Sequence, residues 1–249
     1  MQGEKGIKTV LLAERGRFQE PVHQGENIMS EKIVFDKPGN FLYPVPAVMI
    51  SVAGEVPGQT DRTYREKADV AAYDASGIPN IFTVAWAGTV CSDPPMLSIS
   101  VRRSRYSWHL LKEHGEFVVN LTTDRLVRAA DFCGVRSGRD LNKFEACHLT
   151  PGRGIRVQAP VIEESPVNIE CRVRQVLELG THDMFLAEVV CIQADSRYMD
   201  ERGSFRLEKT GLAAYSHGKY YELGRELGSF GYSVRKKTAR KKKTKKKSN

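Results

Sequence analysis

The stretch from Ser98 to Gly115, "SISVRRSRYSWHLLKEHG", concentrates side chains that can bind an anion. Three arginines and two serines stand between positions 102 and 107, where a strand-like pattern gives way to a helical one. The first turn of a helix exposes unpaired N–H groups with a partial positive charge, and arginine donates paired hydrogen bonds to phosphate oxygens. These residue types fit a phosphate-binding turn, and they also fit an ordinary solvated turn.

Histidine and cysteine give weaker signals. His182, in "LGTHDMF", falls in a turn between two strand-like segments, where a histidine is normally a surface residue. His109, His114 and His148 are expected on a helix surface or in loops, and no pair of them has the spacing of metal ligands. The five cysteines are dispersed without a CxxC pair, which indicates reduced thiols in a cytoplasmic protein rather than a disulfide framework or a zinc site.

The first half of the chain predicts short strands and a few helices. A helix is expected from Ser107 to His114, with Ser107 as its N-cap and Gly115 ending it. A second helix is expected over 124–132, and the polar segment 133–145 is expected to be a loop. Strands are expected at 47–53, 80–86, 96–101 and 116–121.

Two longer strands follow in the second half. In "NIECRVRQV" (168–176), apolar residues alternate with Glu170, Arg172 and Arg174, which is typical of a half-buried strand with its charges in solvent. The segment 184–194 is its expected neighbour in the sheet. Because the strands are short, evenly punctuated and accompanied by few helices, we expect a mainly β protein built as an antiparallel barrel.

The charge distribution distinguishes a strongly basic C-terminal tail from the rest of the chain. Residues 235–247 carry ten Lys or Arg and no acid, so the rest of the chain has a net charge of −2 within the total of +8. We expect 1–28 to be a disordered extension, 29–224 to form one domain with an inserted loop at 55–79, and 225–249 to be a disordered basic tail. The tail suits non-specific contact with polyanions, and no apolar stretch reaches the ~20 residues that span a bilayer.

An ordered set of segments resembles the flavin reductase-like family of FMN-binding split barrels. The segments, from about Leu42 to Gly224, are "YPVPAVMISV", "NIFTVAWAG", "DPPMLSISVRRSRYS", "GEFVVNL", "CGVRSGRDLNKFE", "ECRV" and "LGTHDMFLAEVV". The resemblance implies an antiparallel split β-barrel, FMN as cofactor with FAD as the alternative flavin, and a homodimer. The inserted loop and the lysine-rich tail depart from the family pattern.

The resemblance also implies a set of site residues. It places a first group beside the flavin ring: Asn80, Thr83, Ala85 and Trp86. It places a second group around the ribityl phosphate: Ser100, Arg102, Arg103, Ser104, Tyr106 and Ser107. Ser137 and Lys143 would approach the cofactor from another side, and His182 would contact the nicotinamide, although Thr181 stands where the family often has Asp.

These implications predict an FMN-dependent oxidoreductase that takes electrons from NAD(P)H and delivers them to a second acceptor. The acceptor could be a flavin, a ferric complex, a redox protein or a small molecule. The alternative is a flavoredoxin-like electron carrier that does not oxidise NAD(P)H. A third hypothesis is a non-catalytic binding protein whose basic tail contacts nucleic acid.

Overall fold

A computed structural model describes residues 32–37, 39–55 and 77–235 of the chain. The chain divides after Asn40 into two units, and the helices and strands of the described residues lie in the second unit, Phe41–Asn249. The expected extension at 1–28, most of the inserted loop at 55–79 and the end of the basic tail lie outside the described residues. No described helix is long and apolar enough to cross a membrane.

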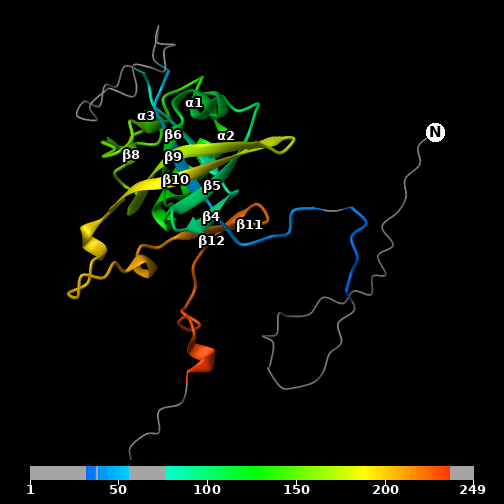
Figure 1. Cartoon of the computed structure of the whole chain (residues 1–249), viewed down its shortest axis with the longest axis vertical. Coiled ribbons are helices and arrows are strands. Elements are labelled where there is room, and N and C mark those ends of the chain that lie inside the picture. Colours follow the sequence, from blue (N-terminus) through cyan, green and yellow to red (C-terminus); the bar gives the residue numbers. More distant parts are fainter. Residues whose placement is uncertain (1–31, 38, 56–76, 236–249) are drawn as a thin grey trace, which may run out of the picture. The chain divides into compact units, whose positions relative to one another are not determined.

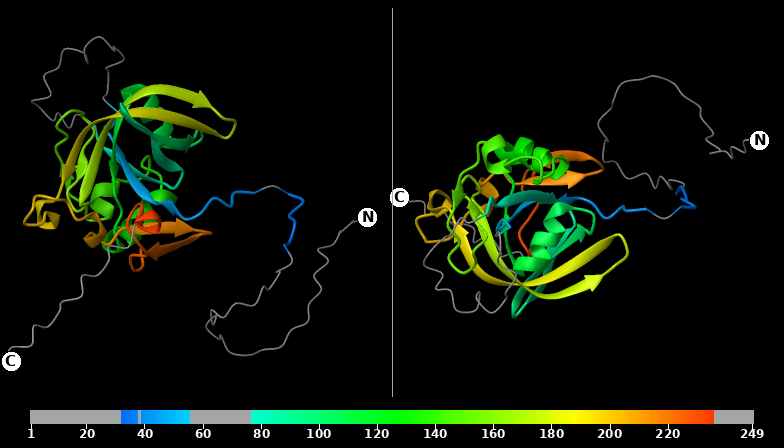
Figure 2. Two further views of the ribbon diagram at one scale, coloured as in Figure 1. Left: turned by 60° about the horizontal axis from the view of Figure 1, so that its bottom comes forward. Right: turned by 90° about the horizontal axis from the view of Figure 1, so that it is seen from above.

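Seven antiparallel strands form the main sheet, in the order β3-β2-β6-β9-β10-β5-β4. These strands are β2 (Val48–Val52), β3 (Asn80–Val84), β4 (Ala87–Ser92), β5 (Pro95–Arg102), β6 (Glu116–Asn120), β9 (Val167–Glu178) and β10 (His182–Ala194). The four strands predicted in the first half of the chain and the pairing of the two long strands are confirmed. The β9–β10 hairpin extends past its neighbours (Figures 1 and 2).

The two edges of this sheet are consecutive in the chain. Only Ala85 and Trp86 separate β3 at one edge from β4 at the other, so the sheet must curl until its edges approach. The Ser100 N–H donates to the Trp86 carbonyl at 2.9 Å across this junction. The result is the predicted antiparallel split barrel.

Smaller elements complete the fold. The strands β1 (Val45–Pro46), β11 (Ala213–Ser216) and β12 (Lys219–Glu222) form a second sheet, and β7 (Pro151–Gly152) pairs with β8 (Val161–Ile162). The helices are α1 (Tyr106–His114), α2 (Val127–Val135) and α3 (Lys143–Ala146), with 3-10 turns at Asp124–Leu126, Ser196–Tyr198, Leu207–Lys209 and Tyr232–Val234.

Apolar residues on the two faces of β2 explain where the helices sit. Ile50 faces a core cluster that includes Leu110 and Leu111 of α1 and Phe117 of β6. Met49, its neighbour in sequence, faces a second cluster on α2 and α3. Since successive strand residues point to opposite faces, α1 packs in the barrel core and α2 and α3 cover the outer face of β2 and β3.

Two local expectations from the sequence are wrong. Ser107 is not the N-cap of α1, because the helix begins one residue earlier and Arg105 occupies the cap position. Segment 133–145 is not simply a loop, because α2 continues to Val135 and α3 begins at Lys143. The predicted end of α1 is confirmed, since Gly115 has φ +67°, a conformation that glycine adopts without steric cost.

Glu170 corrects the expected exposure of β9. Its side chain is fully buried, although strand alternation placed it in solvent. Its carboxylate accepts hydrogen bonds from the backbone N–H groups of Ile155, Arg156 and Val157, at 2.6 to 3.1 Å, and from the Gln193 amide. A buried carboxylate is tolerated when donors surround it in this way, so Glu170 fixes the 153–157 loop to the sheet.

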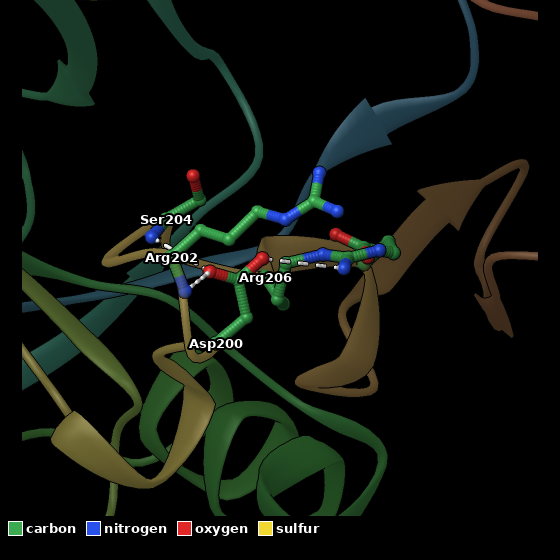
Figure 3. Close-up of polar contacts among 5 residues, drawn as sticks. Asp200, Arg202, Ser204 and Arg206 are labelled. Carbon is green, nitrogen blue, oxygen red and sulfur yellow. Dashed lines mark hydrogen bonds and ion pairs between the residues drawn. The ribbon is translucent and has the colours of Figure 1, made fainter.

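A polar turn connects β10 to the smaller sheet (Figure 3). One carboxylate oxygen of Asp200 accepts the backbone N–H groups of Arg202 and Ser204, each at 2.9 Å, and the other lies 3.5 Å from Arg206. The Ser204 N–H first, and then the other donors, hold the pKa of Asp200 below its usual value. These bonds shape a loop that lies outside the pocket described next.

Candidate functional site

A pocket of about 330 Å³ opens where the edges of the sheet approach each other. Its walls come from residues 82–86 at the end of β3, the end of β5, the turn into α1, and the segment between α2 and α3. This volume falls within the usual range of small-molecule sites. The curling of the sheet therefore brings segments far apart in sequence to one cavity.

Nearly all of the site residues expected from the sequence line this pocket. They are Thr83, Ala85, Trp86, Ser100, Arg102, Ser104, Tyr106, Ser107, Ser137, Lys143 and His182. Asn80 and Arg103 do not line it. The arrangement is a single cavity lined by apolar and aromatic side chains together with cationic and hydroxyl groups.

Arg103 points into an ion-pair network instead. Its guanidinium lies 2.7 Å from Asp183 and 2.9 Å from Glu178, and Trp108 Nε1 donates to the second oxygen of Asp183 at 2.9 Å. These carboxylates raise the pKa of Arg103 above its ordinary value, with Asp183 contributing most. Arg103 therefore links the α1 turn to β10, a structural contact that its place in the arginine cluster did not reveal.

Asn80 lies behind the pocket wall. Its Nδ2 donates to Ser107 Oγ at 2.9 Å, and its Oδ1 is buried with no hydrogen-bond partner among the described residues. A Cβ added at Gly138 would lie 2.0 Å from that oxygen, so Gly138 permits the close approach of the 137–139 segment. Asn80 thus holds Ser107 in the first turn of α1.

The turn into α1 is electrostatically suited to an anion. The N-cap residue Arg105 makes no side-chain capping hydrogen bond to this nine-residue helix. The Trp108 N–H donates to the Arg105 carbonyl at 3.0 Å, so the N–H groups of Tyr106 and Ser107 are the ones that the first turn offers at the pocket. Four arginines line the cavity, namely Arg102, Arg105, Arg136 and Arg139, and no acidic residue of the described chain does. This donor set fits the dianionic phosphate of FMN.

The wall formed by residues 82–86 suits a planar aromatic ring. Phe82, Val84, Ala85 and Trp86 line the pocket there and offer apolar surface and backbone. The Thr83 hydroxyl also lies in this wall but donates to the Ala130 carbonyl of α2 at 2.5 Å. Thr83 therefore anchors β3 to α2, and its proton is already used within the protein.

Lys143 is almost fully buried at the base of the pocket. Its ammonium donates to the backbone carbonyls of Ile81, at 2.7 Å, and Cys133, at 2.9 Å. Burial, the largest influence, lowers the pKa of Lys143. The residue joins β3, α2 and α3, which the sequence, read as a polar loop, did not indicate.

His182 begins β10 and pairs with Arg102 across the sheet. The Thr181 hydroxyl lies 2.9 Å from His182 Nδ1, so Thr181 orients the imidazole. Burial first, and then Arg102, lower the pKa of His182, which is therefore neutral at pH 7. At the opposite end of the arginine cluster, burial and then Glu55 raise the pKa of Tyr106, which remains a neutral phenol.

Sequence reasoning missed several members of the site. Arg105 belongs to the quoted arginine stretch but was not among the expected site residues, and Arg136, Gly138 and Arg139 lie in "CGVRSGRDLNKFE". The density of arginine in that segment is the signal that could have identified them. Arg139 also lies over the Tyr106 ring, 5.4 Å from its centroid, and so joins the segment to α1.

A second, larger groove of about 1240 Å³ contains none of the expected site residues. It is lined by parts of α2, the end of α3 and the segments around Asp195 and Lys209. Both basic and acidic side chains line it, including Arg128, Asp131 and Glu164. Its mixed charge does not favour the binding of one anion.

Comparison with known proteins identifies the family to which the chain belongs. The sequence model of the flavin reductase like domain matches residues 68–224, and the chain belongs to that family. The chain superposes on the flavoredoxin of Desulfovibrio vulgaris (Miyazaki F) with a TM-score of 0.68 and 26% identity, covering 82% of this chain and 100% of that one.

Two sequence relatives extend the comparison. An uncharacterized protein from Archaeoglobus fulgidus is 34% identical over 122 residues, which is 49% of this chain and 69% of the relative. The FMN reductase (NADH) RutF of Klebsiella pneumoniae is 28% identical over 122 residues, which is 49% of this chain and 70% of the relative. The predicted family is confirmed.

Proposed function

We propose that the chain binds FMN in the 330 Å³ pocket and acts as an oxidoreductase that takes electrons from NAD(P)H and delivers them to a second acceptor. The observation that carries the proposal is the uncapped first turn of α1, facing a cavity lined by four arginines and no acid of the described chain. FAD, which also carries phosphate, is the alternative flavin. We further propose that the protein is a cytoplasmic homodimer.

The residues of the chain would share the work of binding. Ser104, Arg105 and Ser107 would hold the phosphate with the N–H groups of α1, and Trp86 with the backbone of 83–86 would hold the ring. When bound, a flavin supplies the redox chemistry, accepting a hydride from nicotinamide and passing electrons onward. The neutral, oriented imidazole of His182 would contact the nicotinamide, and the chain needs no acid or base for that transfer.

The test is the absorption spectrum of the purified chain followed by anaerobic mixing with NADH and with NADPH. A flavin spectrum that bleaches rapidly on mixing is expected. A bound flavin that neither nucleotide reduces would support the flavoredoxin-like carrier instead. A chain that binds no added flavin would contradict the proposal.

His182→Gln tests the proposed nicotinamide contact. We expect a several-fold rise in the KM for the preferred nicotinamide with FMN affinity unchanged, because His182 is not among the residues that we propose hold the phosphate. In the wild-type protein, the KM should rise at low pH with a midpoint below the ordinary pKa of an imidazole, because burial first and then Arg102 lower the pKa of His182. Steady-state kinetics between pH 5 and 8 would measure this dependence, and its persistence in the variant would contradict the assignment.

Gly138→Ala tests the close packing behind the phosphate site. The added methyl group would meet Asn80 Oδ1 at 2.0 Å and displace the side chain that holds Ser107. Loss of one hydrogen bond costs about 1 kcal/mol, so we expect FMN affinity to fall roughly fivefold or more. Gly88→Ala is the matched control, because its Cβ would meet nothing within 4 Å; equal affinities of the two variants for FMN would contradict the account.

A further inference from the structure

Two cysteine thiols meet beside the wall of the flavin pocket. Cys133 of α2 and Cys147, directly after α3, have their Sγ atoms 3.8 Å apart and share a hydrogen bond. They pack in the same apolar cluster, which also contains Phe144 and Ala130. Of the five cysteines, these are the ones that the structure brings within bonding reach of each other.

The two thiols differ in their access to solvent. Cys133 is buried and lines the flavin pocket, whereas Cys147 is half-buried and lines the separate 1240 Å³ groove. A reactant in the groove can therefore reach Cys147 but not Cys133. Because Cys147 is only partly exposed, a small oxidant is favoured over a bulky one.

The Cys133 and Cys147 thiols have different surroundings, which indicates different roles in a reaction. Burial, the largest influence, and then Cys147 raise the pKa of Cys133 to about 12, so Cys133 keeps its proton, and either thiol can donate the shared hydrogen bond. Lys143, which donates to the Cys133 carbonyl at 2.9 Å, is the cation whose charge acts on both sulfurs.

We propose that Cys133 and Cys147 form a peroxide-reactive dithiol, in which Cys147 reacts with a small hydroperoxide and Cys133 then closes an intramolecular disulfide. This reaction goes beyond the proposed flavin chemistry and does not require bound flavin. The observation that carries it is a pair of facing thiols, one half-buried at a groove and the other buried.

The reaction balances in two steps. The Cys147 sulfur attacks a peroxide oxygen and forms an S–O bond while the O–O bond breaks. The departing alkoxide or hydroxide takes up the Cys147 thiol proton and leaves as alcohol or water, and Cys147 becomes a sulfenic acid. The Cys133 sulfur then attacks the Cys147 sulfur, an S–S bond forms, the S–O bond breaks, and the hydroxide leaves as water with the proton of Cys133. Two electrons pass from the dithiol to the peroxide, and an added dithiol reductant restores both thiols.

The geometry permits this closure. The sulfurs must approach by about 1.8 Å to reach the ~2.05 Å of a disulfide bond. Cys147 follows a helix of only four residues and precedes His148, which has φ +54°, so the chain leaves regular structure at this position. The bond would join α2 to α3, the two helices that flank the 134–139 wall of the flavin pocket.

The experiment exposes the full chain, without flavin, to hydrogen peroxide in small excess and then blocks free thiols with an alkylating reagent. Mass spectrometry is expected to find a Cys133–Cys147 cross-linked peptide and a fall from five free thiols to three, both reversed by dithiothreitol. Retention of all five thiols, or loss of Cys91 or Cys191 before this pair, would overturn the proposal.

Variants test the two roles. Cys133→Ser should accumulate a Cys147 sulfenic acid that dimedone traps, and Cys147→Ser should leave Cys133 reduced. Cys191→Ser, which removes another half-buried thiol, should behave as the wild type. A trapped sulfenic acid at Cys133 instead of Cys147 would refute the assigned order. Because flavin is absent throughout, failure here leaves the proposed FMN function untouched.

Discussion

Arg105→Ala is expected to weaken FMN binding by about tenfold or more. Arg105 is the N-cap residue of α1 and lines the pocket at the turn where we propose that the phosphate binds. A hydrogen bond to a charged group contributes roughly 1.5–3 kcal/mol, which corresponds to a tenfold to hundredfold change in dissociation constant. Titration of the protein with FMN, monitored by the quenching of flavin fluorescence, would measure the change in dissociation constant.

The neighbouring Arg103 provides a matched control. Arg103→Ala removes the same kind of side chain two residues away, but outside the pocket. It leaves the buried Asp183 carboxylate without its ion pair, so it should lower the melting temperature while FMN affinity changes little. If Arg103→Ala weakened FMN binding as much as Arg105→Ala, the assignment of these two arginines would be wrong.

Lys143→Met is expected to destabilise the protein by about 3 kcal/mol. The substitution keeps the length and apolar stem of the side chain but leaves the carbonyls of Ile81 and Cys133 without their donor in a buried site, and each lost partner costs roughly 1–3 kcal/mol. For a chain of this size, the melting temperature should fall by roughly 6–12 °C. Thermal unfolding followed by circular dichroism would measure the change.

An exposed lysine separates this effect from the loss of a charge. Lys219→Met, on β12, removes the same charge from an exposed strand position and should change stability by less than about 0.5 kcal/mol. Equal effects at positions 143 and 219 would contradict the structural role of the buried ammonium. The contrast depends on burial and hydrogen bonding, since the substitution is identical.

The strands of the barrel were largely predictable because each carries a local pattern. Alternation at 168–176 and the apolar run at 47–53 correspond to β9 and β2, and Gly115 ends α1 as expected. Glu170 shows the limit of this reasoning. Glu170 is buried because backbone N–H donors 13 to 15 residues earlier in the chain surround its carboxylate, and no pattern within its own strand reveals these donors.

The site was predictable in outline but not in its individual roles. Resemblance to the family named the segments that meet at the pocket, whereas the direction of each side chain depends on long-range partners. Arg103 turns to Asp183, 80 residues away, and Asn80 turns to Ser107, 27 residues away. Lys143 was expected to approach the cofactor, and its carbonyl partners, Ile81 and Cys133, could not be foreseen because they lie on other elements.

The central claim is that the turn into α1 binds the phosphate of a flavin, and one comparison tests it most directly. Side-by-side titration of the purified chain with FMN and with riboflavin isolates the contribution of the phosphate, because the two molecules share the same ring and ribityl chain. We predict one FMN per chain and at least tenfold weaker binding of riboflavin. Equal affinity for the two compounds would contradict the account.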